Sequence, residues 1–245
     1  MDGRVATLDC RVGLGDVRPD STQRLDAIAR TVQDVADLDY ATLGGTGTVT
    51  GAGTAVDGMG MWILRRLTLD IAHTPRMRAE CRARTWVSGI GARWIERRTD
   101  IEAGDRAAIA ATAIWVHVDP VRRSPAPIPP GFAPVWFPVP DGRRISARLR
   151  HPPPPAGAVR HGWPVRATDV DVLGHVNNAA YWAAAEEELA RRGSPRVRAA
   201  AIEFGGGVEP GEPVEAVYAD RDDGFGCWLC VGGEVRASMT VGCGP

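Results

Sequence analysis

The chain has 245 residues, of which 44% are hydrophobic and 24% charged, the ordinary balance of a globular protein of one large or two small domains. Its formal net charge of −1 gives no general electrostatic reason to expect nucleic acid or an acidic membrane as a partner. All 29 basic residues are arginine, which excludes mechanisms that need a catalytic lysine, such as Schiff-base chemistry.

The amino terminus lacks the basic and then apolar pattern of a signal peptide, and no run approaches the roughly 18 apolar residues of a membrane span. We therefore expect a cytoplasmic protein with no membrane span. The five cysteines are scattered, and Cys227 and Cys230 lie in a strand-like stretch, where residues three apart face opposite sides. We expect these cysteines to be buried, reduced and structural, and we expect no metal site.

The first half begins with a short extended segment over residues 4–10. Residues 21–40 carry apolar side chains at helical spacing, and Asp20 or Ser21 is a suitable residue to cap that helix. Strand-like runs follow at 61–71, 79–89, 92–102 and 107–118.

Thirteen of the 19 prolines lie between Pro120 and Pro164. Proline has no N–H donor and resists both helices and central strands, so this stretch predicts a semi-rigid linker over 136–158. The alternative is an ordered loop packed over the surface. The linker separates an N-terminal domain, 1–135, from a C-terminal domain, 159–245.

The second half repeats the order of the first. An extended segment near 161–167 and a helix near 177–192 precede strand-like runs at 196–204, 212–220, 226–232 and 234–242. One strand, one helix and then several antiparallel strands predict a curved sheet around a central helix. Two such units give an α+β protein built as a tandem pseudo-dimer.

The densest polar stretch runs from Asp169 to Tyr181 and reads D-V-D-V-L-G-H-V-N-N-A-A-Y. Singly, such residues suit turns and helix caps, but the run is denser than capping requires. Because it leads into a helix, it also presents unpaired N–H groups at the positive end of the helix dipole. Asp171 and His175 beside that junction are candidates to activate water next to a polarised carbonyl.

An ungapped shift of 153 residues compares the two halves, since it brings Asp16 onto Asp169. Arg18 then falls at Asp171, and Thr22 falls at His175. Only the second half keeps the acid and the imidazole, so we expect a degenerate site in the N-terminal domain, which contributes scaffold and substrate pocket.

The motif D-x-D-x-x-G-H-V-N-N-x-x-Y resembles the second hot-dog domain of acyl-acyl-carrier-protein (acyl-ACP) thioesterases. Further stretches resemble the first helix and the successive strands of that family: Gln33–Ala36, Trp62–Leu67, Thr85–Val87, Arg93–Arg97 and Ile114–Asp119. The resemblance implies a tandem (double) hot-dog fold. It also implies hydrolysis of fatty acyl-ACP to free fatty acid and ACP in fatty-acid biosynthesis.

In that family the residues matching Asp171 and His175 carry catalysis. Related hot-dog thioesterases use the aspartate without the histidine, so the choice of base stays open. Asn177 and Asn178 are expected to shape the helix start and to contact substrate, and Trp62 is a candidate lining residue of the acyl pocket. No dinucleotide, phosphate-loop or metal motif occurs, so we expect no cofactor.

The chain departs from the family pattern at two places. Leu173 stands where plant members have asparagine, and Gly207 and Val208 stand where they have a Glu-Cys pair. Leucine cannot hydrogen-bond water or the carbonyl, so the polar network of the site is in question. Glu203, on the preceding strand, either compensates or is an ordinary strand residue.

An acidic carrier protein predicts a basic docking patch on its thioesterase. The candidate residues are Arg76, Arg78, Arg82, Arg84, Arg93, Arg97 and Arg98, followed by Arg143, Arg144, Arg148 and Arg150. Acyl-CoA thioesterase is the first alternative, a non-catalytic acyl-thioester-binding protein the second, and a hot-dog dehydratase the third. Because the tandem pair already forms a pseudo-dimer, both a monomer and a homodimer are compatible with the sequence.

Overall fold

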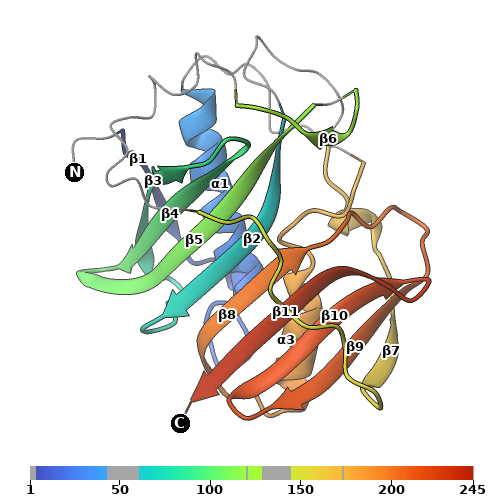
Figure 1. Ribbon diagram of the computed structural model, residues 1–245. Helices are drawn as coiled ribbons and strands as arrows, with labels where there is room; N and C mark the ends of the chain where they lie inside the picture. The colour runs from blue at the N-terminus through green and yellow to red at the C-terminus, as the bar shows by residue number, and fades with distance from the viewer. Residues whose placement is uncertain (1–3, 43–60, 120, 129–144, 173, 245) are drawn as a thin grey trace.

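The computed structural model describes residues 4–42, 61–119, 121–128, 145–172 and 174–244. Its strands form one antiparallel sheet in the order β1-β3-β4-β5-β2-β8-β11-β10-β9-β7, with β6 beside β5 (Figure 1). The strands are β1 (Ala6–Arg11), β2 (Met61–Ile71), β3 (Glu80–Ile90), β4 (Trp94–Ala103), β5 (Arg106–Asp119), β6 (Ser124–Pro125), β7 (Val159–Trp163), β8 (Arg196–Phe204), β9 (Val214–Arg221), β10 (Gly224–Val231) and β11 (Glu234–Gly244).

The two halves of the chain meet where β2 pairs with β8, from Arg66 opposite Glu203 to Asp70 opposite Ala199. The sheet is therefore continuous across the molecule. Helix α1 (Leu25–Ala41) and helix α3 (Trp182–Arg191) lie on the same side of it and contact one another (Figure 1). Each half is a curved antiparallel sheet with a central helix, which confirms the predicted α+β arrangement.

Helix α1 begins at Leu25, four residues later than the predicted start at Ser21. Ser21 has φ of +69°, and Thr22 pairs with Arg76 in an isolated β-bridge, so this segment is held in a non-helical conformation. The predicted caps at Asp20 and Ser21 were therefore wrong. The Leu25 N–H instead donates to the carboxylate of Glu186 in α3 at 2.7 Å.

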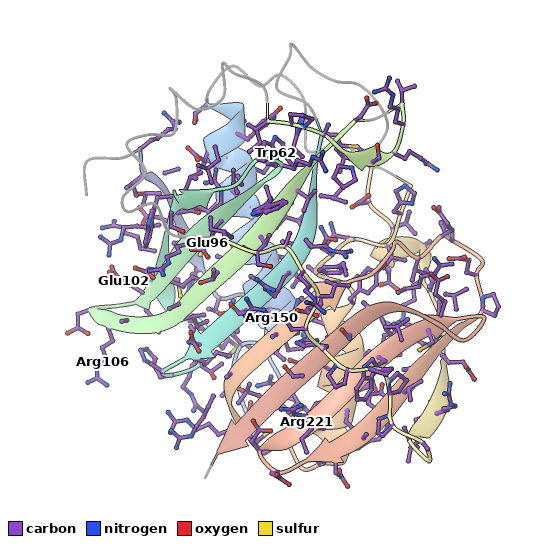
Figure 2. The ribbon with its side chains drawn as sticks, in the orientation of Figure 1. Trp62, Glu96, Glu102, Arg106, Arg150 and Arg221 are labelled. Carbon is purple, nitrogen blue, oxygen red and sulfur yellow. The ribbon has the colours of Figure 1, made fainter. Side chains whose placement is uncertain are left out.

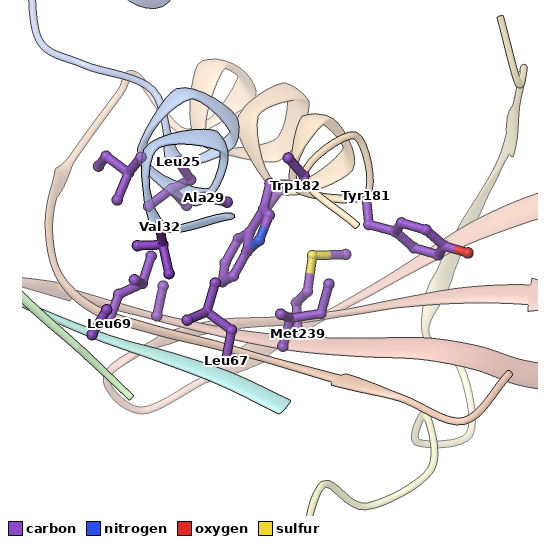
Figure 3. Close-up of a cluster of buried hydrophobic side chains, with 14 of the residues drawn as sticks. Leu25, Ala29, Val32, Leu67, Leu69, Tyr181, Trp182 and Met239 are labelled. Carbon is purple, nitrogen blue, oxygen red and sulfur yellow. The ribbon is translucent and has the colours of Figure 1, made fainter. Parts of the chain in front are cut away.

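Trp182 links the two halves of the core. It is fully buried, and Figure 3 shows its ring reaching from α3 past α1 toward Leu67 of β2. Met239 of β11 lies on its other side and is also fully buried (Figure 3). Burying one such side chain contributes about 1.5–3 kcal/mol, so this contact favours docking of the two halves.

Residues 145–158 cross the outer face of the sheet, on the side away from the helices (Figure 1). This segment, called the strap below, contacts the strands in their order across the sheet. Trp94 of β4 donates to the Ile145 carbonyl, and Trp228 of β10 donates to the Pro152 carbonyl. The described part of the proline-rich stretch is thus an ordered surface segment, the alternative that the sequence left open; residues 136–144 lie outside the described residues.

Glu203 anchors the middle of the strap. Its side chain is 1% exposed, and its Oε2 accepts the backbone N–H groups of Arg150 and His151 at 2.7 and 2.9 Å. Arg66 lies 3.6 Å from its other oxygen. Ile202 and Phe204, its neighbours in β8, belong to the core on the helix side, so Glu203 faces outward. It has a structural role under the strap.

Cys227 and Cys230 lie on opposite faces of β10. Cys227 belongs to the main core, whereas Cys230 packs with Trp228 and Val217 on the outer face. Burial raises the pKa of both thiols, so both stay protonated at neutral pH. The prediction of buried cysteines is confirmed for this pair and for Cys81, whereas Cys10 and Cys243 are only partly buried. Neither α1 nor α3 is long and apolar enough to cross a membrane.

Candidate active site

The polar motif forms a tight turn just before α3. The Asp171 N–H donates to the His175 carbonyl, and the Gly174 N–H donates to the Asp171 carbonyl, both at 3.0 Å. Gly174 has φ of +76°, a conformation that favours glycine, so the glycine of the motif is required by the turn. The turn brings Asp171 and His175 to its two ends. Leu173 lies outside the described residues.

Asp169 and Asn177 hold this turn in place. Asp169 Oδ2 accepts the Arg166 N–H at 2.8 Å, and the Asp169 carbonyl accepts the Asn177 N–H at 2.8 Å. Asn177 Oδ1 in turn accepts the Ala179 N–H at 2.9 Å, while its Nδ2 donates to Asp171 Oδ2 at 3.3 Å. Asn177 therefore starts the helical turns before α3 and orients the Asp171 carboxylate.

Glu209 is a residue of this site that the sequence did not reveal. Its Oε1 lies 3.0 Å from His175 Nδ1, although the geometry does not make a hydrogen bond. Their side chains are 53% and 32% exposed. The contact is attractive when the imidazole is protonated, because a carboxylate stabilises a nearby cation. The signal was available, since Glu209 directly follows the Gly-Val positions where the sequence lacks the family's acid.

Tyr181 positions the loop that carries Glu209. The Val208 N–H donates to the Tyr181 hydroxyl at 2.9 Å, and the Val176 N–H donates to the Val208 carbonyl at 3.2 Å. Burial raises the pKa of Tyr181 to about 12, so the phenol stays neutral, and its oxygen accepts the hydrogen bond that holds the loop. Its ring packs edge-on against Phe204 (5.2 Å between centroids). The glycine-rich loop is thereby fixed beside the turn.

A small cavity of about 10 Å³ lies beside the turn, between α1 and the start of α3. It has room for about one water molecule. Its polar amide side chains are Gln33 and Asn178; most of the rest of its lining is aliphatic or aromatic, including Val32, Trp115 and Trp182. The cavity thus combines a few polar groups with an apolar wall, as ligand sites commonly do.

Trp62 does not line this cavity. It is buried near the start of β2, and its ring lies 5.2 Å from that of His117 in β5. Figure 2 shows it at the end of the sheet beside β6. Its neighbour two residues along, Leu64, does line the cavity. A role for Trp62 in holding the acyl chain stays a prediction.

Several arginines of the predicted docking patch are already paired. Arg97 is 5% exposed and lies 2.8 Å from the fully buried Asp39, and burial lowers its pKa. Arg82 pairs with Asp9 at 2.7 Å. Arg84 and Arg98 likewise have carboxylate partners. Arg150 lies on the strap, over the outer face of the sheet (Figure 2). Arg143 and Arg144 lie outside the described residues.

The corresponding loop of the N-terminal half carries an ion pair. Arg18, the counterpart of Asp171, contacts Glu186 of α3 through two hydrogen bonds of 2.7 and 2.8 Å. These side chains are only 9% and 11% exposed. Thr22, the counterpart of His175, donates its hydroxyl to Asp20. Within the described residues, no group of three His, Cys, Asp or Glu side chains is placed to hold a metal ion.

The fold agrees with that of solved thioesterases. The 12:0-ACP thioesterase of Umbellularia californica superposes with a TM-score of 0.81 at 17% identity, covering 98% of this chain and 97% of that one. An acyl-ACP thioesterase of Bacteroides thetaiotaomicron gives a TM-score of 0.79 at 17% identity, covering 97% of each chain. The predicted tandem hot-dog fold is therefore confirmed.

Sequence comparison identifies the family. The uncharacterized protein Rv2001 of Mycobacterium tuberculosis is 24% identical over 247 aligned residues, covering 98% of this chain and 92% of that protein. The model of the acyl-ACP thioesterase N-terminal domain matches residues 5–135, and that of the acyl-ACP thioesterase C-terminal domain matches residues 154–231. The chain thus belongs to the acyl-ACP thioesterase family.

Proposed function

We propose that this protein hydrolyses fatty acyl-ACP to free fatty acid and ACP during fatty-acid biosynthesis, and that Asp171 and His175 carry the chemistry. Membership of the family supports thioester hydrolysis in general. The observation that carries the assignment of the site is the turn before α3, where Asn177 orients Asp171 and Glu209 lies beside His175. Those contacts bring two carboxylates and one imidazole together at this turn.

In the proposed reaction, water attacks the carbonyl carbon of the thioester. His175 accepts a proton from this water through Nε2, because its Nδ1 faces Glu209. The Glu209 carboxylate stabilises the imidazolium that forms, and the Asp171 carboxylate orients the water. When the tetrahedral intermediate collapses, the carbon–sulfur bond breaks. The thiolate of the phosphopantetheine arm then leaves and takes the proton from His175, which yields the acid and the free thiol.

The test is free-thiol release from acyl-ACPs and matched acyl-CoAs of C4 to C18, with wild type and His175→Ala measured side by side. Release by the wild type that collapses in the variant is the expected result. Thr22→Ala is the matched control, because Thr22 occupies the same place in the loop of the other half. A wild-type protein that binds acyl thioesters without turnover would support the acyl-binding alternative instead.

An acyl-CoA thioesterase is the second candidate, and the paired arginines favour it. Arg82, Arg84 and Arg97 already have acidic partners, so they offer an acidic carrier protein less net positive charge than the sequence suggested. The same panel separates the two substrates. A higher kcat/KM for acyl-CoA than for the matched acyl-ACP would replace our choice of carrier and leave the reaction unchanged.

A further inference from the structure

The cavity beside the turn contains hydrogen-bonding groups without protein partners. Within the described residues, the Gln33 side-chain amide makes no hydrogen bond, and the backbone N–H of Asn178 has no acceptor. The indole N–H of Trp115, which also lines the cavity, is buried and has no partner. The unpaired indole N–H is buried, which is unfavourable, and the Gln33 and Asn178 donors beside it are partly exposed and available, so a ligand that brings an acceptor oxygen fits this place.

The other half of the molecule shows where such an oxygen sits. Glu186 is the counterpart of Gln33 at the shift of 153 residues, and Leu25 is the counterpart of Asn178. Glu186 Oε1 accepts the Leu25 N–H at 2.7 Å and a hydrogen bond from Arg18 at 2.8 Å. In that half, a carboxylate oxygen from α3 therefore lies in front of the first N–H of α1.

Gln33 has the same length as Glu186 but carries an amide. A carboxylate here would itself accept the Asn178 N–H, as Glu186 does with Leu25, and would place negative charge where the reaction develops it. The described residues show no bond between the Gln33 amide and the Asn178 N–H, and the amide nitrogen adds two N–H donors that a carboxylate lacks. The exchange of acid for amide is thus the difference that opens this half to a substrate oxygen.

We propose that Gln33 is a further catalytic residue, contributed by the N-terminal half to the site of the C-terminal half. This proposal rests on the proposed thioester hydrolysis. The Gln33 Nε2 and the Asn178 backbone N–H donate to the carbonyl oxygen of the thioester. When water adds to the carbonyl carbon, the π electrons move to this oxygen, and both donors stabilise the resulting oxyanion. They release it as the carbonyl re-forms and the thiolate departs.

Kinetics of Gln33→Ala and Gln33→Glu test the proposal. Loss of one such donor lowers kcat by about 10²-fold or more, so we expect that loss for Gln33→Ala with KM nearly unchanged. Gln33→Glu should lose more, because its carboxylate repels the oxyanion. Alanine is the strongest helix former, and Gln33 is only partly buried, so the variant is expected to fold. Asp34→Ala, the exposed neighbour on α1, is the matched control and should keep the wild-type kcat.

A binding measurement isolates the contact itself. Two non-hydrolysable CoA derivatives are compared: a 2-oxoalkyl thioether, which keeps a carbonyl, and the plain alkyl thioether. The wild type should prefer the ketone by about tenfold, which corresponds to about 1.4 kcal/mol. Gln33→Ala should reduce this preference and bind the plain thioether normally. A structural role of Gln33 would instead weaken both ligands equally.

The outcomes separate this proposal from the proposed function. If the wild type hydrolyses the substrate and Gln33→Ala keeps its kcat and its preference for the ketone, Gln33 has no catalytic role although the function stands. If the wild type neither hydrolyses nor binds any acyl thioester, both proposals fail. A loss of kcat with loss of the ketone preference, at unchanged binding of the thioether, supports Gln33 as a carbonyl-binding group.

Discussion

The loop at 13–25 and the described part of the loop at 166–178 repeat the same backbone hydrogen bonds, but they carry different side chains at matching positions. In the first loop the Arg24 N–H donates to the Asp16 carbonyl at 2.8 Å, and in the second the Asn177 N–H donates to the Asp169 carbonyl at 2.8 Å. The bonds that close the two tight turns repeat as well: Arg18 to Thr22 and Asp171 to His175.

The comparison separates what the fold needs from what the chemistry needs. Both loops keep an aspartate whose carboxylate caps the start of the loop, Asp16 on the Gly13 N–H and Asp169 on the Arg166 N–H. These aspartates are structural. The differences lie in the side chains that face the opposite helix. In the first loop an ion pair fills the space in front of the helix start, whereas in the second loop polar groups lie beside a cavity.

Asp171→Asn should give the largest effect, because it tests directly whether the second loop carries the catalytic chemistry. Removal of the charge while the shape is kept should lower kcat/KM by about 10³-fold, since positioned acid–base groups typically contribute 10²–10⁴. Steady-state thiol release measures it, with circular dichroism as the check of the fold. If the variant hydrolyses at the wild-type rate, the assignment of the site to this half is wrong.

Arg18→Met tests the other half. Breaking a largely buried ion pair leaves Glu186 with an uncompensated charge, so we expect a loss of about 3 kcal/mol in the free energy of unfolding. Urea denaturation measures this loss. The double variant Arg18→Met, Glu186→Gln should recover most of it, because the amide removes the buried charge while its oxygen can still accept the Leu25 N–H. Equal stability of the single variant and the wild type would mean that the ion pair does not hold the halves together.

Gly174→Ala tests whether the two tight turns have the same backbone requirement. A Cβ at this position meets no atom within 4 Å, so the expected loss of about 1–2 kcal/mol comes only from φ of +76°. The opposite change, Ser21→Gly, relieves φ of +69° in the other turn. It should raise stability by less than about 1 kcal/mol, because glycine also gains entropy in the unfolded chain. Chemical denaturation compares them, and two shifts of the same sign would show that the turns are not equivalent.

The smallest expected effect concerns the strap over the second half. Burial lowers the pKa of His151, which packs on Ser238, below its unfolded value. The unfolded chain therefore binds more protons as pH falls through about 6.5, and stability declines there. His151→Asn should flatten this decline. Urea midpoints between pH 5 and 7.5 measure it, and identical slopes for both proteins would exclude His151 as the cause.

The strands were largely predictable, because alternation of apolar and polar side chains is a local signal. The predicted runs at 61–71 and 196–204 agree with β2 and β8. The start of α1 was not predictable, since its first N–H is satisfied by Glu186, 161 residues away in the sequence. A different, local reason applies to α3, which begins at Trp182 rather than at Asn177 because the residues between form consecutive turns.

The motif located the turn, but not all of its neighbours. The sequence predicted Asp171 and His175 as a pair, whereas the structure also brings Glu209 to His175 and Asn177 to Asp171. Of the two roles that the sequence left open for Glu203, the structure shows the one outside the turn, since this side chain lies under the strap. Which face of β8 meets the helices depends on the register of the whole sheet, and no local pattern gives it.

The continuous sheet across β2 and β8 joins both halves in one chain, and this affects how the two sites can evolve. In a symmetric homodimer one gene encodes both copies, so every substitution is made twice, and a change that ruins one site ruins the other. Joining the halves in one chain keeps them at a high effective concentration and allows each to vary alone. Arg18 in one loop and Asp171 in the other give the two halves different functions. The two identical chains of a homodimer cannot differ in this way.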